Sequence, residues 1–152
     1  MRAAVGPDYP VWMRFDSQEF LMDYGITLDD AITVAKLAEA AGLDAIHVSA
    51  HGDGNYGATY STGHATDIRN GFVDNATAIK AAVDIPVICP GRIEPEDADR
   101  FIAQGKLDFV TMGRKLLADP HLPNKLAAGT PQAVRPCVYC YTCISAIFNS
   151  SH

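Results

Sequence analysis

The sequence predicts an α/β fold in which a parallel β-sheet packs against helices, and two observations indicate it. Predicted strands alternate with predicted helices along the chain, and the strands are short, mostly apolar runs bounded by turn residues. Apolar strands that are joined through helices form parallel sheets covered by those helices. The predicted strands are Val11–Phe15, Ala45–Ser49, Ile85–Cys89 and Leu107–Met112.

Capping and periodicity predict the helix after the first strand. Thr27 is a preferred N-cap residue, and Asp29 and Asp30 lie in the first turn, where the helix dipole favours anions. Gly42 is placed to end this helix. The residues predicted to form its buried stripe are Ala31, Val34, Ala35, Ala38 and Ala41.

The other connections follow the same logic. A polar loop is predicted from Ala50 to about Gly71, followed by a helix over Asn75–Val83. Pro95 opens a further helix that ends at Gly105, with Ala98, Phe101 and Ile102 facing the core. Two short helices are predicted over residues 115–118 and 122–128.

Size and composition bound the function. The chain has 152 residues, 48% of them hydrophobic, which is enough for one domain with a core. The net charge of −6 argues against nucleic acid as a partner, because phosphate binding needs an excess of Lys and Arg on one face. No stretch suggests a membrane partner or a secretory signal. Clustered cysteines without such a signal predict a cytoplasmic location.

Two predicted strands are followed by the same dipeptide. Gly91-Arg92 follows the third strand, and Gly113-Arg114 follows the fourth. Glycine lets a phosphate approach backbone N–H groups, and arginine supplies a charged fork. Either pair alone is better explained as a turn with a surface arginine. Two equivalent pairs on adjacent strands, with a short extra helix after the second, match the phosphate site of (β/α)8 barrels.

Three of the four cysteines form a C-x2-C-x2-C run, Cys137, Cys140 and Cys143. Such a run lets three thiolates face one point, which suits a metal or an iron–sulfur cluster better than a disulfide. Zinc is the main alternative, although no second short pair of ligands follows here. The residues alone leave iron–sulfur and zinc open. Tyr139 and Tyr141 are interleaved with the cysteines and are predicted to shield the bound group, although a passive loop role fits equally well.

These features together resemble the C-terminal half of the flavin barrel in the old yellow enzyme family, also known as the NADH:flavin oxidoreductase family. The closer likeness is to its iron–sulfur branch, which includes 2,4-dienoyl-CoA reductase and trimethylamine dehydrogenase. The resemblance extends from Val5 to Phe148. Its motifs are Val11-Trp12-Met13-Arg14-Phe15, Ile46-His47-Val48-Ser49, Ile85-Pro86-Val87-Ile88, Pro90-Gly91-Arg92-Ile93, Met112-Gly113-Arg114, Leu117-Ala118-Asp119-Pro120 and Arg135-Pro136-Cys137-x2-Cys140.

The resemblance implies a partial (β/α)8 TIM barrel of about four βα units over residues 1–130. These units would be the fifth to eighth of a full barrel. Residues 131–152 would begin a cysteine-rich iron–sulfur segment that is truncated here. The first four strands, the fourth cluster ligand and the nucleotide-binding domains would be absent from the chain, because a complete barrel needs about 250 residues.

The resemblance also implies roles for individual residues. Arg14 would lie beside the pyrimidine edge of FMN, where a fixed cation stabilises the reduced flavin. Two pairs would hold the FMN phosphate: Gly91, Arg92, Gly113 and Arg114. Three thiolates would be ligands of a 4Fe-4S cluster: Cys137, Cys140 and Cys143.

The implied function is that of an FMN-dependent, NAD(P)H-linked oxidoreductase of the ene-reductase or 2,4-dienoyl-CoA reductase type. In the complete enzyme, NAD(P)H would reduce FAD, electrons would cross the cluster to FMN, and FMN would reduce a small-molecule substrate such as an activated alkene. The alternative is a non-catalytic phosphate-binding half-barrel with a zinc-binding cysteine knuckle. The activity of this fragment alone is left open by the sequence.

Histidines near the second strand are further candidates. His51 follows this strand at the end where barrel enzymes carry their catalytic groups, so it is predicted to donate a proton or hydrogen bond to a substrate. Asp53 is nearly as well placed, and His64 is a weaker candidate. His47 lies inside the strand, where it either fills the core or faces the flavin. The polar loop gives an equally simple reading, in which His51 only caps a turn.

The outer strands of a half-barrel would be open edges. Open edges pair readily with other strands. The sequence therefore predicts a homo-oligomer or aggregation for the isolated fragment.

Overall fold

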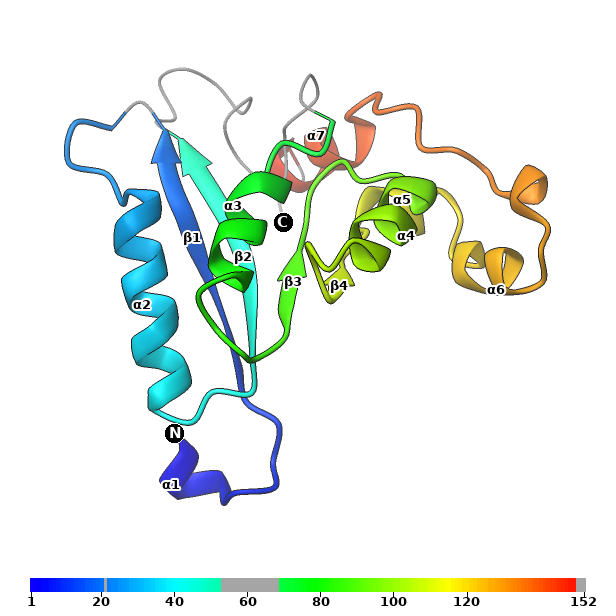
Figure 1. Cartoon of the computed structure of the whole chain (residues 1–152). Coiled ribbons are helices and arrows are strands. Elements are labelled where there is room, and N and C mark those ends of the chain that lie inside the picture. Colours follow the sequence, from blue (N-terminus) through cyan, green and yellow to red (C-terminus); the bar gives the residue numbers. More distant parts are fainter. Residues whose placement is uncertain (21, 53–68, 150–152) are drawn as a thin grey trace. The chain divides into compact units, whose positions relative to one another are not determined.

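The computed structural model describes residues 1–20, 22–52 and 69–149, and strands and helices alternate along most of the chain (Figure 1). Four strands form one parallel sheet in the order β1-β2-β3-β4. Their bounds are β1 (Trp12–Phe20), β2 (Ala45–Gly52), β3 (Val87–Cys89) and β4 (Phe109–Val110). The helices are α1 (Arg2–Val5), α2 (Leu28–Ala40), α3 (Val73–Lys80), α4 (Pro95–Ala103), α5 (Arg114–Ala118), α6 (Leu122–Ala127), the 3-10 helix η3 (Pro131–Ala133) and α7 (Thr142–Asn149).

The chain divides into two compact units, Met1–Thr111 and the segment from Met112 onward. The first unit contains the whole sheet together with α1 to α4, and the second contains α5 to α7.

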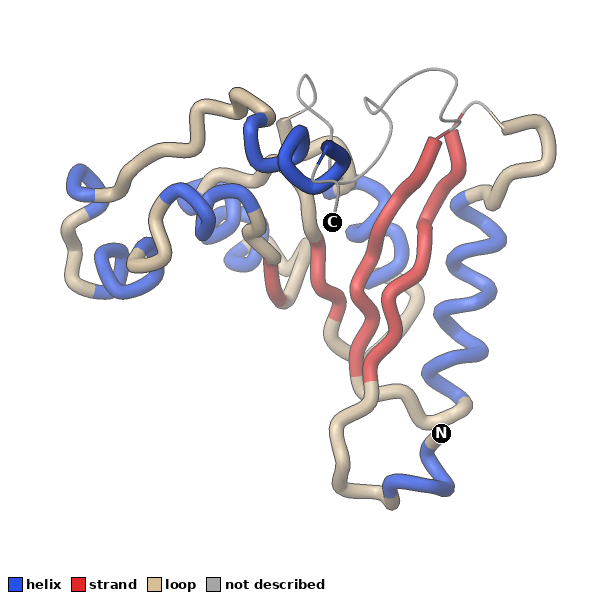
Figure 2. Tube along the Cα trace, turned by 180° about the vertical axis from the view of Figure 1, so that it is seen from behind, coloured by secondary structure: helices blue, strands red, loops and turns tan. Residues whose placement is uncertain are grey.

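Consecutive strand order identifies the type of α/β fold in the first unit. Right-handed crossovers between neighbouring parallel strands place every connecting helix on the same face of the sheet. α2 and α3 pack on the strands in this way, and Figure 2 shows the sheet from the opposite side. Doubly wound sheets reverse their strand order and carry helices on both faces, whereas barrels do not. The predicted partial (β/α)8 barrel of four βα units is therefore confirmed.

The core of the first unit lies between the strands and these helices. Ile46 and Val48 on β2 and Val87 on β3 are completely buried, as are Ala31 and Ala35 on α2. The small alanine side chains bring α2 close to the sheet. Val34, which the stripe was predicted to include, is 41% exposed because it lies at the edge of this narrow face.

Start and stop signals account for the positions of the helices. Thr27 and Asp30 form a capping box at the start of α2, and Gly42 adopts φ 87° after its end. Pro95 occupies the first turn of α4, as predicted. The α4 stripe prediction was correct for Ala98 and Phe101 but wrong for Ile102, which is 41% exposed.

Strand lengths differ from the predicted ones. β1 continues beyond Phe15 to Phe20 and β2 beyond Ser49 to Gly52, because polar residues at their ends bond across the pair. The buried Ser17 hydroxyl donates to the Ser49 carbonyl at 2.8 Å, and the Ser49 hydroxyl donates to Asp16. The strand β4 is shorter than predicted, with only Phe109 and Val110 in the ladder.

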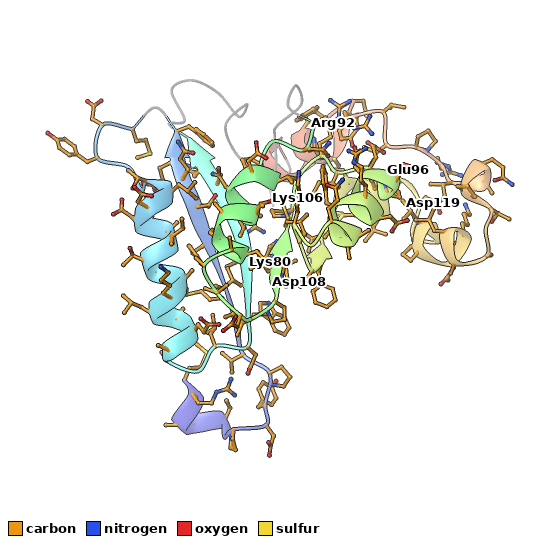
Figure 3. All side chains as sticks on the ribbon, viewed as in Figure 1. Lys80, Arg92, Glu96, Lys106, Asp108 and Asp119 are labelled. Atoms are coloured by element: carbon orange, nitrogen blue, oxygen red, sulfur yellow. The ribbon has the colours of Figure 1, made fainter. Side chains whose placement is uncertain are left out.

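An ion pair fixes the amino ends of the strands. Lys80 Nζ at the end of α3 lies 2.8 Å from Asp108 Oδ1, and Asp108 Oδ2 accepts from the Val87 amide at 2.8 Å. Figure 3 shows Lys80 and Asp108 together, well away from Arg92, which follows the carboxyl end of β3. In barrels, the amino ends of the strands serve stability and the carboxyl ends carry the active site.

Candidate functional site

Three polar residues of the first unit lie near one another, two of them on the adjacent strands β1 and β2. Arg14 on β1 is the register partner of His47 on β2. His47 Nε2 lies 3.2 Å from the hydroxyl of Thr111, which follows β4. Burial, and secondly the positive charge of Arg14, lower the pKa of His47. The imidazole is therefore neutral at pH 7 and shares one hydrogen bond with Thr111.

A second polar cluster lies at the carboxyl ends of β1 and β2. The Ser17 hydroxyl, which donates to the Ser49 carbonyl, accepts from Asn75 Nδ2 on α3 at 3.1 Å. Ser17 is fully buried and Ser49 is 6% exposed. Sequence reasoning missed this cluster, because single serines at strand ends carry no spacing signal.

His51 lies near the carboxyl end of β2, opposite Glu19 of β1, and its side chain is exposed. His51 was predicted to follow the strand and instead belongs to its last two residues, still at the carboxyl end. Its catalytic role remains a prediction. Asp53 and His64 lie outside the described residues.

The turn after β3 depends on a glycine. Gly91 has φ 116°, and a Cβ at this position would lie 3.2 Å from the ring of Phe72. The carbonyl of the next residue, Arg92, accepts from the Asn70 amide at 3.0 Å. Asn70 itself has φ 62°. Two unusual backbone conformations therefore define the turn that carries Arg92.

A buried carboxylate on α4 supports this turn. Asp97 is 4% exposed, and it accepts from Asn70 Nδ2 at 3.1 Å and from Arg69 Nε at 2.7 Å. Arg100 Nη2 lies 2.5 Å from its other oxygen. The hydrogen bond from Asn70, followed by those of the arginines, holds the pKa of Asp97 below its ordinary value despite burial. The sequence indicated Asp97 only as an acidic residue in a first helical turn.

In the second unit, Arg114 begins α5 between two tyrosines. Its guanidinium carbon lies 5.1 Å from the ring centroid of Tyr139 and 5.1 Å from that of Tyr141. Arg114 Nη1 is buried and has no hydrogen-bond partner among the described residues. Lys115 Nζ lies 5.6 Å from the Tyr139 ring. The contacts of Arg114 were not foreseen, because the two tyrosines are distant in sequence.

Gly113, directly before Arg114, has φ −83° and therefore no need of a glycine for its backbone conformation. A Cβ at Gly113 would meet no atom of the described chain within 4 Å. Open space at Gly113 and a buried N–H of Arg114 without a partner fit an incoming anion such as a phosphate. The two glycine–arginine pairs belong to different units, so their convergence on one phosphate stays a prediction.

All four cysteines are free thiols. Cys89 ends β3 in the core, and burial raises its pKa to about 12, which makes it an inert thiol. Cys140 is exposed, and hydrogen bonds from the side chain and then the amide of Thr142 lower its pKa. Among the residues that the structure describes, no three His, Cys, Asp or Glu side chains are gathered as metal ligands. Cys137 and Cys143 therefore lie in the same segment as Cys140 without forming a closed site.

The segment that leads into the cysteines is anchored by Asp119. This carboxylate is 4% exposed and accepts from Lys125 Nζ at 2.5 Å, from the Arg135 amide at 2.8 Å and from the His121 amide at 3.1 Å. The Lys125 hydrogen bond, followed by that of Arg135, lowers the pKa of Asp119 to about 2. Figure 3 labels Asp119 on this part of the chain.

The first unit has the fold class of half a (β/α)8 barrel, and the loops after the last two strands of such barrels are common phosphate sites. The chain belongs to the NADH:flavin oxidoreductase / NADH oxidase family, whose model matches residues 1–133. The family consists of oxidoreductases, so the prediction of an enzyme is confirmed at the level of the family.

Two relatives and one solved structure show the extent of the likeness. An NADH oxidase of Thermoanaerobacter brockii is 41% identical over 142 residues, which cover 92% of this chain and 21% of the relative. A metal reductase of Desulforamulus reducens is 36% identical, with 97% of this chain and 22% of the relative covered. A 2-naphthoyl-CoA reductase complex superposes with TM-score 0.82 at 30% identity over 93% of this chain and 21% of that one. The chain thus spans about a fifth of the length of these proteins.

No helix in the described part of the chain is both long and apolar enough to cross a bilayer.

Proposed function

We propose that this chain supplies the phosphate-binding half of an FMN-dependent oxidoreductase. The observation that carries the proposal is the buried Nη1 of Arg114, which has no hydrogen-bond partner among the described residues. The preceding residue, Gly113, has open space around the position that a Cβ would occupy. A guanidinium in this condition is stabilised by a phosphate that accepts its N–H groups. Family membership supplies the chemical context, since FMN carries such a phosphate.

The residues of this chain would divide the work of binding between them. Gly91, Arg92, Gly113 and Arg114 would hold the phosphate, with Asn70 and Asp97 maintaining the turn at Gly91 and Arg92. Arg14 would lie at the pyrimidine edge of the isoalloxazine ring, where its positive charge stabilises added electron density. The lowered pKa of His47 favours its neutral form, so Arg14 would be the main positive charge on β1 and β2. When bound, FMN supplies hydride transfer.

Substrate reduction is the reaction class that the relatives favour. Proteins similar to this chain include a cinnamate reductase and a 2-naphthoyl-CoA reductase. We propose that the complete protein reduces an activated alkene or a similar small molecule with NAD(P)H as the electron source. His51, exposed at the carboxyl end of β2, is the proposed proton or hydrogen-bond donor to that substrate.

The cysteine segment is proposed to bind a 4Fe-4S cluster through Cys137, Cys140 and Cys143. Three thiols within one short segment are the donor set that such clusters use. A lowered pKa at Cys140 agrees with a thiol that readily becomes a thiolate ligand. The described residues do not gather the three sulfurs around one point. A cytoplasmic location remains a prediction.

Replacement of Arg114 by alanine in the full-length protein tests the phosphate assignment. We expect a weaker affinity for FMN with little change in substrate preference, because the lost contacts are made to the phosphate. Lys36→Ala is the matched control, since it removes an exposed cation from α2. Equal FMN occupancy in Arg114→Ala and in the control would contradict the assignment.

Analysis of metal and sulfide in the same preparations tests the cluster. Iron and acid-labile sulfide, both lost in a variant with all three cysteines replaced by serine, are expected. Stoichiometric zinc in a colourless protein would instead favour the non-catalytic alternative.

A further inference from the structure

The arginine assigned to the phosphate is in contact with the cysteine segment. Tyr139 and Tyr141 both place their ring centroids 5.1 Å from the Arg114 guanidinium carbon. These two tyrosines are the residues immediately before and after Cys140. Arg114 thus contacts the backbone neighbours of the central thiol on both sides.

The backbone of both tyrosines is unusual. Tyr139 has φ 53° and Tyr141 has φ 62°, in the left-handed region that bulky L-residues rarely adopt. Such conformations persist only where the surroundings determine them strongly, and they cluster at ligand sites.

Contact with aromatic rings restricts the guanidinium. A guanidinium carbon within about 6 Å of a ring centroid is attracted by the ring face. With two rings at this distance, Arg114 has fewer rotamers available, while its Nη1 keeps no hydrogen-bond partner in the described chain. The rings therefore orient the charged group without using this donor.

We infer that Tyr139 and Tyr141 are positioning residues that hold the guanidinium of Arg114 for the FMN phosphate. This inference rests on the proposed function.

The two tyrosines differ as probes. Tyr139 also approaches Lys115, which is 8% exposed, so its removal disturbs a second cation. Tyr141→Leu is therefore the cleaner variant, and Tyr141→Phe should preserve the effect because the ring face is kept. Tyr24→Leu is the matched control, since Tyr24 is fully exposed.

The experiment is titration of the flavin-free, full-length protein with FMN and with riboflavin, which lacks the phosphate. A contact of this kind corresponds to a change of about threefold to thirtyfold in affinity. We expect Tyr141→Leu to weaken FMN binding by that factor and riboflavin binding by less than twofold. Tyr141→Phe and Tyr24→Leu should bind both as the wild type does. Unchanged FMN affinity in Tyr141→Leu, or equal losses for FMN and riboflavin, would overturn the inference.

Arg114→Ala separates this inference from the proposed function. If Arg114→Ala lowers FMN affinity while the tyrosine variants do not, the phosphate assignment stands and the positioning role fails. If Arg114→Ala leaves FMN affinity unchanged, the phosphate assignment itself fails.

Discussion

Replacement of Gly91 by alanine tests whether the turn after β3 is built around a glycine. A φ of 116° lies outside the regions that L-residues favour, and such strain costs about 1–3 kcal/mol. The added Cβ would lie 3.2 Å from the ring of Phe72, which is 5% exposed and has little room to move. Overpacking of this kind adds about 1–3 kcal/mol. The expected loss of unfolding free energy is therefore about 2–6 kcal/mol.

Gly105→Ala is the matched control for this variant. Gly105 has φ 69°, and a Cβ there would meet nothing within 4 Å in the described structure, so the expected cost is about 1–2 kcal/mol of backbone strain alone. Thermal unfolding of the full-length protein, followed in its FMN-free form, measures both. We expect Gly91→Ala to melt clearly below Gly105→Ala, and to bind FMN more weakly. Equal melting temperatures for the two variants would refute the reasoning about Phe72.

Three further predictions concern other parts of the chain. Asp97→Asn is expected to weaken FMN binding several-fold with little effect on riboflavin binding. The variant loses the carboxylate charge that holds Asn70, and the Asn70 amide in turn donates to the carbonyl of Arg92. Identical FMN titrations of the variant and the wild type would contradict this role. The pKa of Asp119 in the folded protein is about 2, below its ordinary value of 3.8. The ionised Asp119 carboxylate therefore contributes its full share of folding stability above pH 3.8, and this contribution is lost as the pH falls toward 2. The difference in melting temperature between wild type and Asp119→Asn should accordingly shrink between pH 5 and about 2, and a difference that stayed constant would contradict it. The isolated 152-residue chain is expected to dimerise or precipitate and to gain little thermal stability from FMN, because β1 and β4 are the outer strands and expose Trp12 (60%) and Phe109 (57%). A soluble monomer in size-exclusion chromatography, with a cooperative transition raised by FMN, would show this to be wrong.

The sequence predicted those features of the fold that depend on local signals. Thr27 with Asp30, Gly42 and Pro95 each mark a helix end through interactions within a few residues, and the structure has all three where expected. The apolar pattern likewise located all four strands. The lengths of β1 and β2 could not be predicted, because they depend on the hydrogen bond of Ser17 with a residue 32 positions away.

In the candidate site too, local sequence signals predicted some features, while others depend on contacts between distant residues. Repetition of a dipeptide after two strands made Gly91-Arg92 and Gly113-Arg114 visible in the sequence. What supports them was not visible. Asp97 reaches the first turn through Asn70, which lies 27 positions earlier, and Arg114 meets tyrosines from a separate segment. Such contacts depend on the folded path of the chain rather than on spacing, so no local pattern announces them.

The preference of the full-length protein for FMN over riboflavin is the most direct test of the phosphate site. It should be measured in the wild type, in Arg92→Ala, in Arg114→Ala and in the double variant. If both arginines bind one phosphate, each single variant loses a large part of the preference, and the double variant loses less than the sum of the two. Full retention of the preference in all variants would contradict the account.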